Sequence, residues 1–289
     1  MKIVPFIPPS QRKVAMLAAQ SETAPVMIHG SAGTGKNAMA RWIHKHSALS
    51  LGPFISAEKD KKITDQLPLA DGGTFLISEI GEWPRGDQKQ LLQFLRTKSV
   101  PDTQNPNLTK LLNVRVIATS SQILENRAKG GLFNSELLQK LNVFRIEMPE
   151  LAQRKDFEDV VKGILEEITH ILHKEHLREL SEEAWKLVKK YEWPGNLREM
   201  RNVLRMAATL AQGERIEASN FPDFKHEQIN FHASREDFEK IYLTELLKAH
   251  EGDLEKVAIA SQMHSKALLA RMQRFGIKPE LFKKDPTKS

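Results

Sequence analysis

Eight residues near the start of the chain, GSAGTGKN at 30–37, constrain its fold more than any other stretch. They follow a short apolar run and precede a helical pattern, AMARWIHKH at 38–46. A strand, a G-x-x-x-x-G-K loop and a helix in this order are typical of a phosphate-binding loop, whose N–H groups surround phosphate oxygens. The sequence therefore predicts nucleotide contacts, with a purely structural turn as the alternative, at Gly30, Ser31, Ala32, Gly33, Thr34, Gly35, Lys36 and Asn37.

Short apolar runs alternate with helical patterns up to about residue 150, and then the strand signals stop. The runs are PVMIHG, GTFLISEI, NVRVIATSS and NVFRIEMP. Runs of this length between amphipathic segments are typical of buried parallel strands. Later patterns predict helices over 181–191, with Ser181 as the N-cap, and over 196–213. We expect an α/β domain with a parallel sheet and helices on both faces, followed by a helical domain.

The second apolar run ends in Ser78 and Glu79. In ATP-hydrolysing sites an acid at the first position binds Mg²⁺, and a glutamate at the second polarises the attacking water. A serine hydroxyl brings no charge to a divalent cation, so Ser78 weakens the Mg²⁺ side of the site. Glu79 is the residual catalytic candidate. We predict no metal site made by the protein alone, and Mg²⁺ only together with a nucleotide; the chain has no cysteine for thiolate ligands.

The stretch ADGGTFLISEIGEWP at 70–84 resembles the AAA+ domain of bacterial enhancer-binding proteins, the sigma-54-dependent transcription activators. Further blocks resemble the family's sensor-one strand, finger segment and sensor-two motif: NVRVIATSSQIL, LFNSELLQKLNVFRIEMPEL and WPGNLREMRN. The resemblance implies ATP or ADP as ligand, with Ser121 and Arg198 as further nucleotide contacts. It also implies an AAA+ α/β subdomain over 1–152, a helical lid over 153–224, a linker over 225–234 and a Fis-type helix-turn-helix domain over 235–289.

Departures from the family pattern affect ATP hydrolysis. Two finger-segment arginines that reach a neighbouring subunit's γ-phosphate in the family fall at Asn134 and Lys140. An arginine finger contributes about 10³–10⁵ in rate. The long insertion that carries the family's GAFTGA loop, which touches the sigma factor, is replaced by a short polar link after the PF strand at 53–54. We therefore expect weak or absent hydrolysis and no remodelling of sigma-54 polymerase.

The basic charge of the chain lies at its end. Residues 256–289 contain eight Lys or Arg and two acids, which equals the whole net charge of +6. A basic end on a neutral body favours double-stranded DNA as partner, although a solubilising tail is an alternative. In the pattern HSKALLARMQRF, Leu268 and Met272 are expected in the core. The groove-facing residues are then Ser265, Lys266, Leu269, Ala270 and Arg271.

These features favour a DNA-binding transcription regulator. The alternatives are an active AAA+ ATPase that remodels a protein, and a non-catalytic partner or inhibitor of an intact enhancer-binding protein. We expect a homo-oligomer, either a dimer through the C-terminal domain or an AAA+ ring, with RNA polymerase as a further partner. No apolar run reaches about 18 residues, so no membrane span and a cytoplasmic location are expected. The phosphate loop begins at Gly30, so we expect no receiver domain before it.

Overall fold

The computed structural model describes residues 7–101, 108–221, 240, 243–244, 246–248, 250, 252–261 and 263–282. The chain forms two compact units. The first extends to Val160 and includes Trp193–Glu199, and the second comprises Val161–Glu192 and the chain from Met200 onward.

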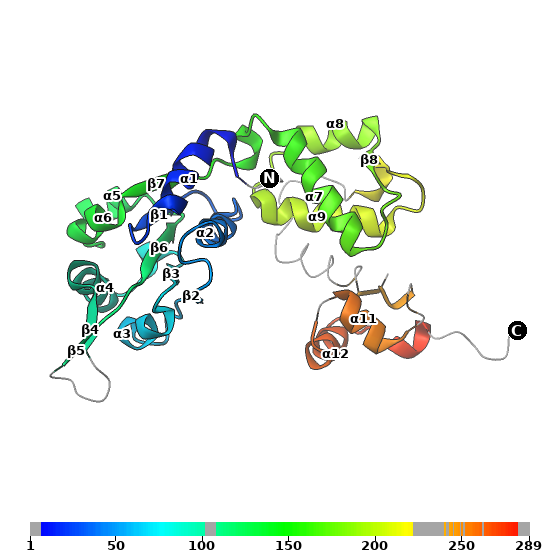
Figure 1. Cartoon of the computed structure of the whole chain (residues 1–289). Coiled ribbons are helices and arrows are strands. Elements are labelled where there is room, and N and C mark those ends of the chain that lie inside the picture. Colours follow the sequence, from blue (N-terminus) through cyan, green and yellow to red (C-terminus); the bar gives the residue numbers. More distant parts are fainter. Residues whose placement is uncertain are drawn as a thin grey trace, which may run out of the picture. The chain divides into compact units, whose positions relative to one another are not determined.

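The first unit is built on a parallel sheet of five strands, in the order β2-β3-β6-β1-β7 (Figure 1). The four strands predicted from apolar runs are confirmed, and β2 adds the PF segment. Two further strands pair as an antiparallel hairpin, β4 with β5. The bounds are β1 Val26–His29, β2 Phe54–Ser56, β3 Thr74–Ile77, β4 Ser99–Pro101, β5 Thr109–Leu111, β6 Arg115–Ser120 and β7 Phe144–Glu147.

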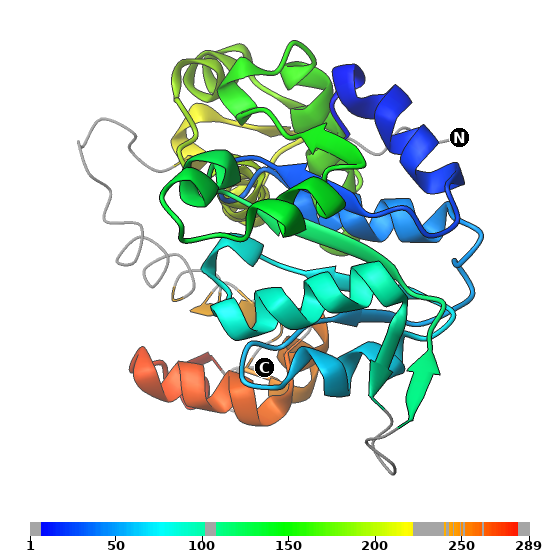
Figure 2. The ribbon, with the colours of Figure 1, turned by 90° about the vertical axis from the view of Figure 1, so that its left-hand side faces the viewer.

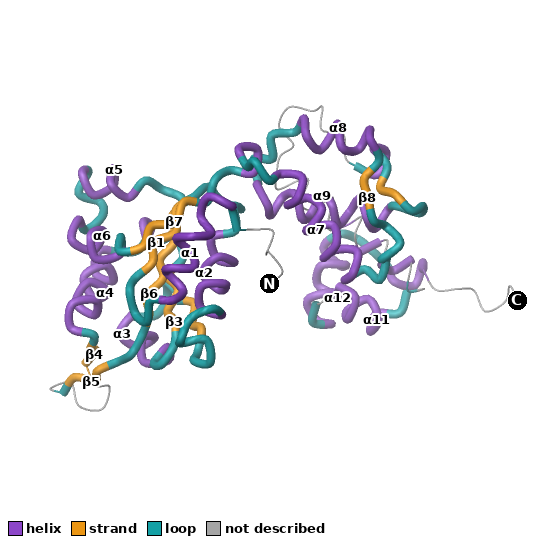
Figure 3. The backbone as a smooth tube through the Cα atoms, turned by 45° about the horizontal axis from the view of Figure 1, so that its top comes forward, coloured by secondary structure: helices purple, strands orange, loops and turns teal. Residues whose placement is uncertain are grey.

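Helices cover both faces of the sheet, as predicted (Figure 3). Alternate strand residues point to opposite faces. Phe75 and Ile77 therefore join the core under α3, α4, α5 and α6, while Leu76 joins the core under α1 and α2. Figure 2 looks onto the α4 side. The bounds are α1 Arg12–Gln20, α2 Lys36–Lys45, α3 Ile63–Gln66, α4 Arg85–Thr97, α5 Leu124–Lys129 and α6 Ser135–Leu141.

The second unit is mainly helical. The Ser181 hydroxyl accepts a hydrogen bond from the Ala184 N–H at 3.3 Å, which confirms the predicted N-cap. Helix α9 ends at Leu210, earlier than predicted, and the Lys174 ammonium donates to three carbonyls at that end. These bonds satisfy C-terminal acceptors that a longer helix would use internally. The bounds are α7 Phe157–Ile171, β8 Glu179–Leu180, α8 Glu182–Lys190, α9 Asn196–Leu210 and β9 Arg215–Ile216.

The described C-terminal residues include the short helices α11 Leu254–Ser261 and α12 Ser265–Arg274. Leu268 and Met272 are each 1% exposed, as predicted for core positions. They pack in a cluster that includes Leu243, Leu246, Leu247, Val257 and Ala258. The predicted linker 225–234 and residues 235–239 of the predicted helix-turn-helix domain lie outside the described residues.

Six short 3-10 turns complete the elements in the residues that the structure describes. They are η1 Pro9–Gln11, η2 Leu67–Ala70, η3 Ile80–Glu82, η4 Leu151–Gln153, η5 Ala218–Asn220 and η6 Pro279–Phe282. Within the part of the chain described, no helix has the length and apolarity that a membrane crossing requires.

Candidate functional site

The predicted phosphate loop joins β1 to α2 at the carboxyl end of the sheet. Its backbone is left-handed at Gly33 (φ 80°) and at Gly35 (φ 96°), a conformation that side chains disfavour. A Cβ at Gly33 would lie 2.1 Å from the Gly195 carbonyl oxygen, and one at Gly30 would lie 2.5 Å from that of Met148. The loop therefore keeps its shape because only glycine fits at these positions.

The loop offers donors of the kind that a phosphate group needs. Within the described chain, the N–H groups of Ala32, Gly33 and Gly35 donate no hydrogen bond, although Thr34 N–H reaches the Ser31 carbonyl at 3.4 Å. The first turn of α2 adds further unpaired N–H groups and the positive end of a helix dipole. A cradle of backbone N–H groups beside a lysine fits a phosphate.

Lys36 lies 7% exposed at the centre of this cradle. Its ammonium donates to the carbonyls of Gly30 at 2.7 Å and Ser31 at 3.2 Å. It also forms an ion pair with the Glu79 carboxylate, 3.0 Å from Oε1. The loop, the lysine and the predicted catalytic glutamate thus form one connected network.

Ser121 completes the network from the end of β6. Both its N–H and its hydroxyl donate to Glu79 Oε2, at 2.7 Å and 2.8 Å. Burial opposes ionisation of Glu79, but the bonds from Ser121 and Lys36 together outweigh it and lower the pKa of this carboxyl. Glu79 is therefore ionised at neutral pH, and its backbone is left-handed at φ 52°.

The side of the site that was predicted to serve Mg²⁺ is formed by uncharged groups. The Ser78 hydroxyl donates to Asn37 Oδ1 at 3.3 Å, so these two predicted contacts face each other. Mg²⁺ is usually held by one or two carboxylates and by phosphate oxygens. Neither group supplies charge, and Glu79 is already paired, so the residues present do not fit a Mg²⁺ ion held by protein alone. Among the described residues, no three His, Asp or Glu side chains gather as a metal site.

Asn196 braces the loop, a role that we had not predicted although it lies within the sensor-two motif. Its amide donates to the Ala32 carbonyl at 3.0 Å, and its Oδ1 accepts from the Leu151 N–H at 2.8 Å. Arg198, the predicted contact of that motif, is exposed on the first turn of α9. Within the described chain, no hydrogen bond or ion pair joins its guanidinium to the loop.

The Gly33→Ala variant tests how tightly the loop is packed. We expect it to lower the free energy of unfolding by roughly 2–4 kcal/mol, because a Cβ there is both strained and in collision with Gly195. The matched control is Gly86→Ala on α4, where an added Cβ meets nothing within 4 Å. Thermal unfolding of both variants measures the difference. Equal melting temperatures would show that the loop yields to accommodate the methyl group.

The two positions predicted as degenerate fingers are the N-cap of α6 and a residue of its last turn. Asn134 caps this helix, its Oδ1 accepting from the Leu137 N–H at 2.9 Å. Lys140 is exposed in the last turn. Asn134 therefore has a local structural role in this chain, and an arginine there would lose the cap.

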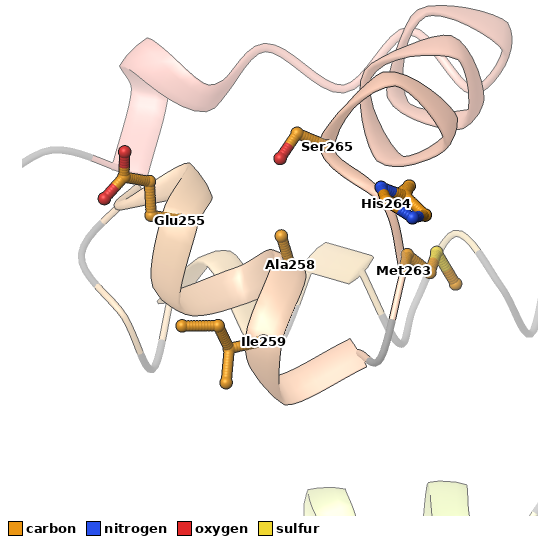
Figure 4. A pocket seen from close by; sticks show the side chains of 6 residues that line it. All are labelled: Glu255, Ala258, Ile259, Met263, His264 and Ser265. Carbon is orange, nitrogen blue, oxygen red and sulfur yellow. The ribbon is translucent and has the colours of Figure 1, made fainter.

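The predicted DNA-contacting residues all lie on α12. Ser265, Lys266, Leu269 and Ala270 are exposed, and Arg271 is half-buried. A hollow of about 520 Å³ lies between α11 and the start of α12 (Figure 4). In Figure 4 the side chains of Ser265 and Ala258 point toward each other across it. The exposed residues of α12 thus include the cations Lys266 and Arg274 together with small, apolar and amide side chains.

Family models match most of the chain. Residues 10–151 match the model described as sigma-54 interaction domain, and residues 152–237 match the AAA+ ATPase lid domain. The chain is 30% identical to the transcriptional regulatory protein ZraR of Salmonella typhimurium, over 91% of this chain and 65% of ZraR. It is 28% identical to the alginate biosynthesis transcriptional regulatory protein AlgB of Pseudomonas syringae pv. tomato, over 88% of this chain and 62% of AlgB. It thus spans less than two thirds of these relatives.

Solved structures share the fold. The crystal structure of NtrX from Brucella abortus in complex with ADP has a TM-score of 0.63 at 24% identity, over 92% of this chain and 67% of that one. A mutant of RuvB from Thermotoga maritima has a TM-score of 0.52 at 14% identity, over 92% of this chain and 87% of that one. At these identities the likeness concerns the fold alone, which is that of AAA+ proteins.

Proposed function

Since the chain belongs, through residues 10–151, to the sigma-54 interaction domain family, we propose that it is a DNA-binding transcription regulator that holds ADP or ATP with little or no hydrolysis. The site combines groups suited to binding phosphate with a group unsuited to holding Mg²⁺, and this contrast supports the proposal. The chain has the glycine loop and the buried Lys36 of the family pattern. At the position where the family has an acid for Mg²⁺, it has the uncharged Ser78. The protein then uses its nucleotide as a bound signal.

The short link after β2 supports the proposal that the protein does not remodel sigma-54 polymerase. Gln66, 3% exposed, accepts from the Glu58 N–H at 2.8 Å. Its amide donates to the carbonyls of Glu58 and Lys61, both at 2.9 Å. A buried amide with these bonds closes residues 58–62 into a compact turn. Such a turn offers no extended loop for insertion into a partner.

DNA binding is proposed for the C-terminal helices. Basic residues gather toward the end of the chain, and α12 exposes Lys266 beside the partly exposed Arg271. A helix with this face fits the major groove, where cations meet phosphates and guanine edges. We further propose a dimer through this part or an AAA+ ring, RNA polymerase as a downstream partner and a cytoplasmic location.

Selection of bound DNA tests this assignment. The wild type is expected to enrich a defined duplex sequence, and its affinity should fall steeply as salt rises, because phosphate contacts release counterions. Arg271→Ala should weaken binding or change the selected sequence, by about tenfold or more in affinity. Lys189→Ala on α8 is the matched control for loss of one positive charge. Unchanged affinity and sequence in Arg271→Ala would remove α12 as the reading helix.

A second candidate is a partner of an intact enhancer-binding protein. It is favoured by exposed apolar side chains on the C-terminal helices, since Ile259 is 78% exposed and Leu269 is 48% exposed. Exposed apolar groups of this kind are typical of protein contacts. Co-purification with an intact activator, together with no duplex DNA bound at low salt, would favour this candidate over the first.

A further inference from the structure

We propose that the phosphate site selects a nucleoside diphosphate over a triphosphate, through Glu79 held by Ser121 against Lys36. The inference rests on the proposed function, since it requires that the loop binds a nucleotide. It goes beyond that function by naming which nucleotide the protein holds.

The charge of Lys36 already has partners within the protein. In phosphate loops the lysine reaches the outer phosphates and neutralises them. Here the ammonium already lies between two loop carbonyls and the Glu79 carboxylate, with Oε1 at 3.0 Å. Its positive charge is therefore partly offset by Glu79 before any ligand arrives.

Glu79 is held in place by hydrogen bonds in addition to its ion pair with Lys36. Its other oxygen accepts two hydrogen bonds from Ser121, and its own N–H reaches the Thr119 hydroxyl at 3.2 Å. Ser121 and Thr119 lie at the end of β6, which pairs with β3 next to Glu79. One carboxylate oxygen thus meets Lys36 while the other is held by Ser121. The glutamate is thus fixed beside the lysine by the sheet itself.

A nucleoside triphosphate and a diphosphate differ in the negative charge that they bring near Lys36. A triphosphate adds a terminal phosphate near Lys36, and this group carries the most negative charge of the nucleotide. The fixed carboxylate of Glu79 repels that charge. Mg²⁺ would relieve the repulsion, but Ser78 and Asn37 bring no charge to hold it and are bonded to each other. A diphosphate has one phosphate and one negative charge fewer, so Glu79 repels it less, and the unpaired N–H groups of the loop still bind its phosphates.

Calorimetric titration of the purified chain with ADP and with adenylyl imidodiphosphate, each with Mg²⁺, tests the inference. The wild type is expected to bind ADP about tenfold more tightly than the triphosphate analogue. Glu79→Gln removes the charge and Ser121→Ala removes the side-chain bond that fixes it. Both variants should move the ratio of the two affinities toward one.

Two substitutions serve as matched controls. Glu82→Gln removes an exposed acid that pairs with Lys59, and Ser50→Ala removes an exposed hydroxyl, so neither should change the ratio. Equal or tighter binding of the triphosphate analogue by the wild type would overturn the inference. So would a wild-type ratio in both Glu79→Gln and Ser121→Ala. Binding of neither nucleotide would instead overturn the nucleotide pocket of the proposed function.

Discussion

Replacing Lys36 by methionine is expected to weaken ADP binding by about a hundredfold or more, because it removes the only ammonium that the structure places in the phosphate cradle of the described chain. Methionine keeps the unbranched stem, so the buried volume near the loop changes little. The loop carbonyls of Gly30 and Ser31 lose their donor, and Glu79 loses its partner. Titration with a fluorescent ADP analogue measures the loss.

Lys45→Met is the control, since Lys45 is exposed at the other end of the same helix. Its affinity for ADP should match that of the wild type. If Lys36→Met bound ADP as tightly as Lys45→Met, the glycine loop would be a structural turn, which was the alternative interpretation of the sequence.

Restoring one carboxylate and two guanidinium groups should turn the site into an ATPase. The triple variant Ser78→Asp, Asn134→Arg and Lys140→Arg is expected to raise ATP turnover at least about 10³-fold, the contribution of an arginine finger. The aspartate would supply a charge for Mg²⁺, and in the proposed AAA+ ring the guanidinium groups would contact the phosphate bound by a neighbouring chain. Phosphate release at saturating ATP measures the gain.

The triple variant needs two controls on α6, one for the lost N-cap bond and one for the added charge. Asn134→Arg removes the N-cap bond to Leu137, which costs about 1 kcal/mol, so thermal unfolding is followed in parallel. Gln139→Arg, an added charge at an exposed position of the same helix, controls for charge alone. A folded triple variant with wild-type turnover would show that these three positions are not what limits hydrolysis.

The sequence was informative wherever a local pattern determines structure. Buried apolar runs predicted four strands, and the spacing of glycines and Lys36 predicted the loop. The pattern of apolar residues also placed Leu268 and Met272 in the core, where each is 1% exposed. In each case neighbouring residues along the chain carry the signal.

The contacts that define the site were not predictable in the same way, because they join distant residues. Ser121 and Glu79 are 42 residues apart, and they meet only because β3 and β6 are neighbours in the sheet. Asn196 and Ala32 are 164 residues apart. Strand order and the return of the chain at the sensor-two motif bring these pairs together, and neither follows from periodicity.

The central claim is that the protein binds a nucleotide without hydrolysing it. Its most direct test is phosphate release by the wild type at saturating ATP, with bound nucleotide quantified in the same sample. The account predicts bound nucleotide and turnover at least about 10³-fold below the roughly 1 s⁻¹ at the lower end of ordinary enzymes. Sustained release at about 1 s⁻¹ that disappears in Lys36→Met would contradict it.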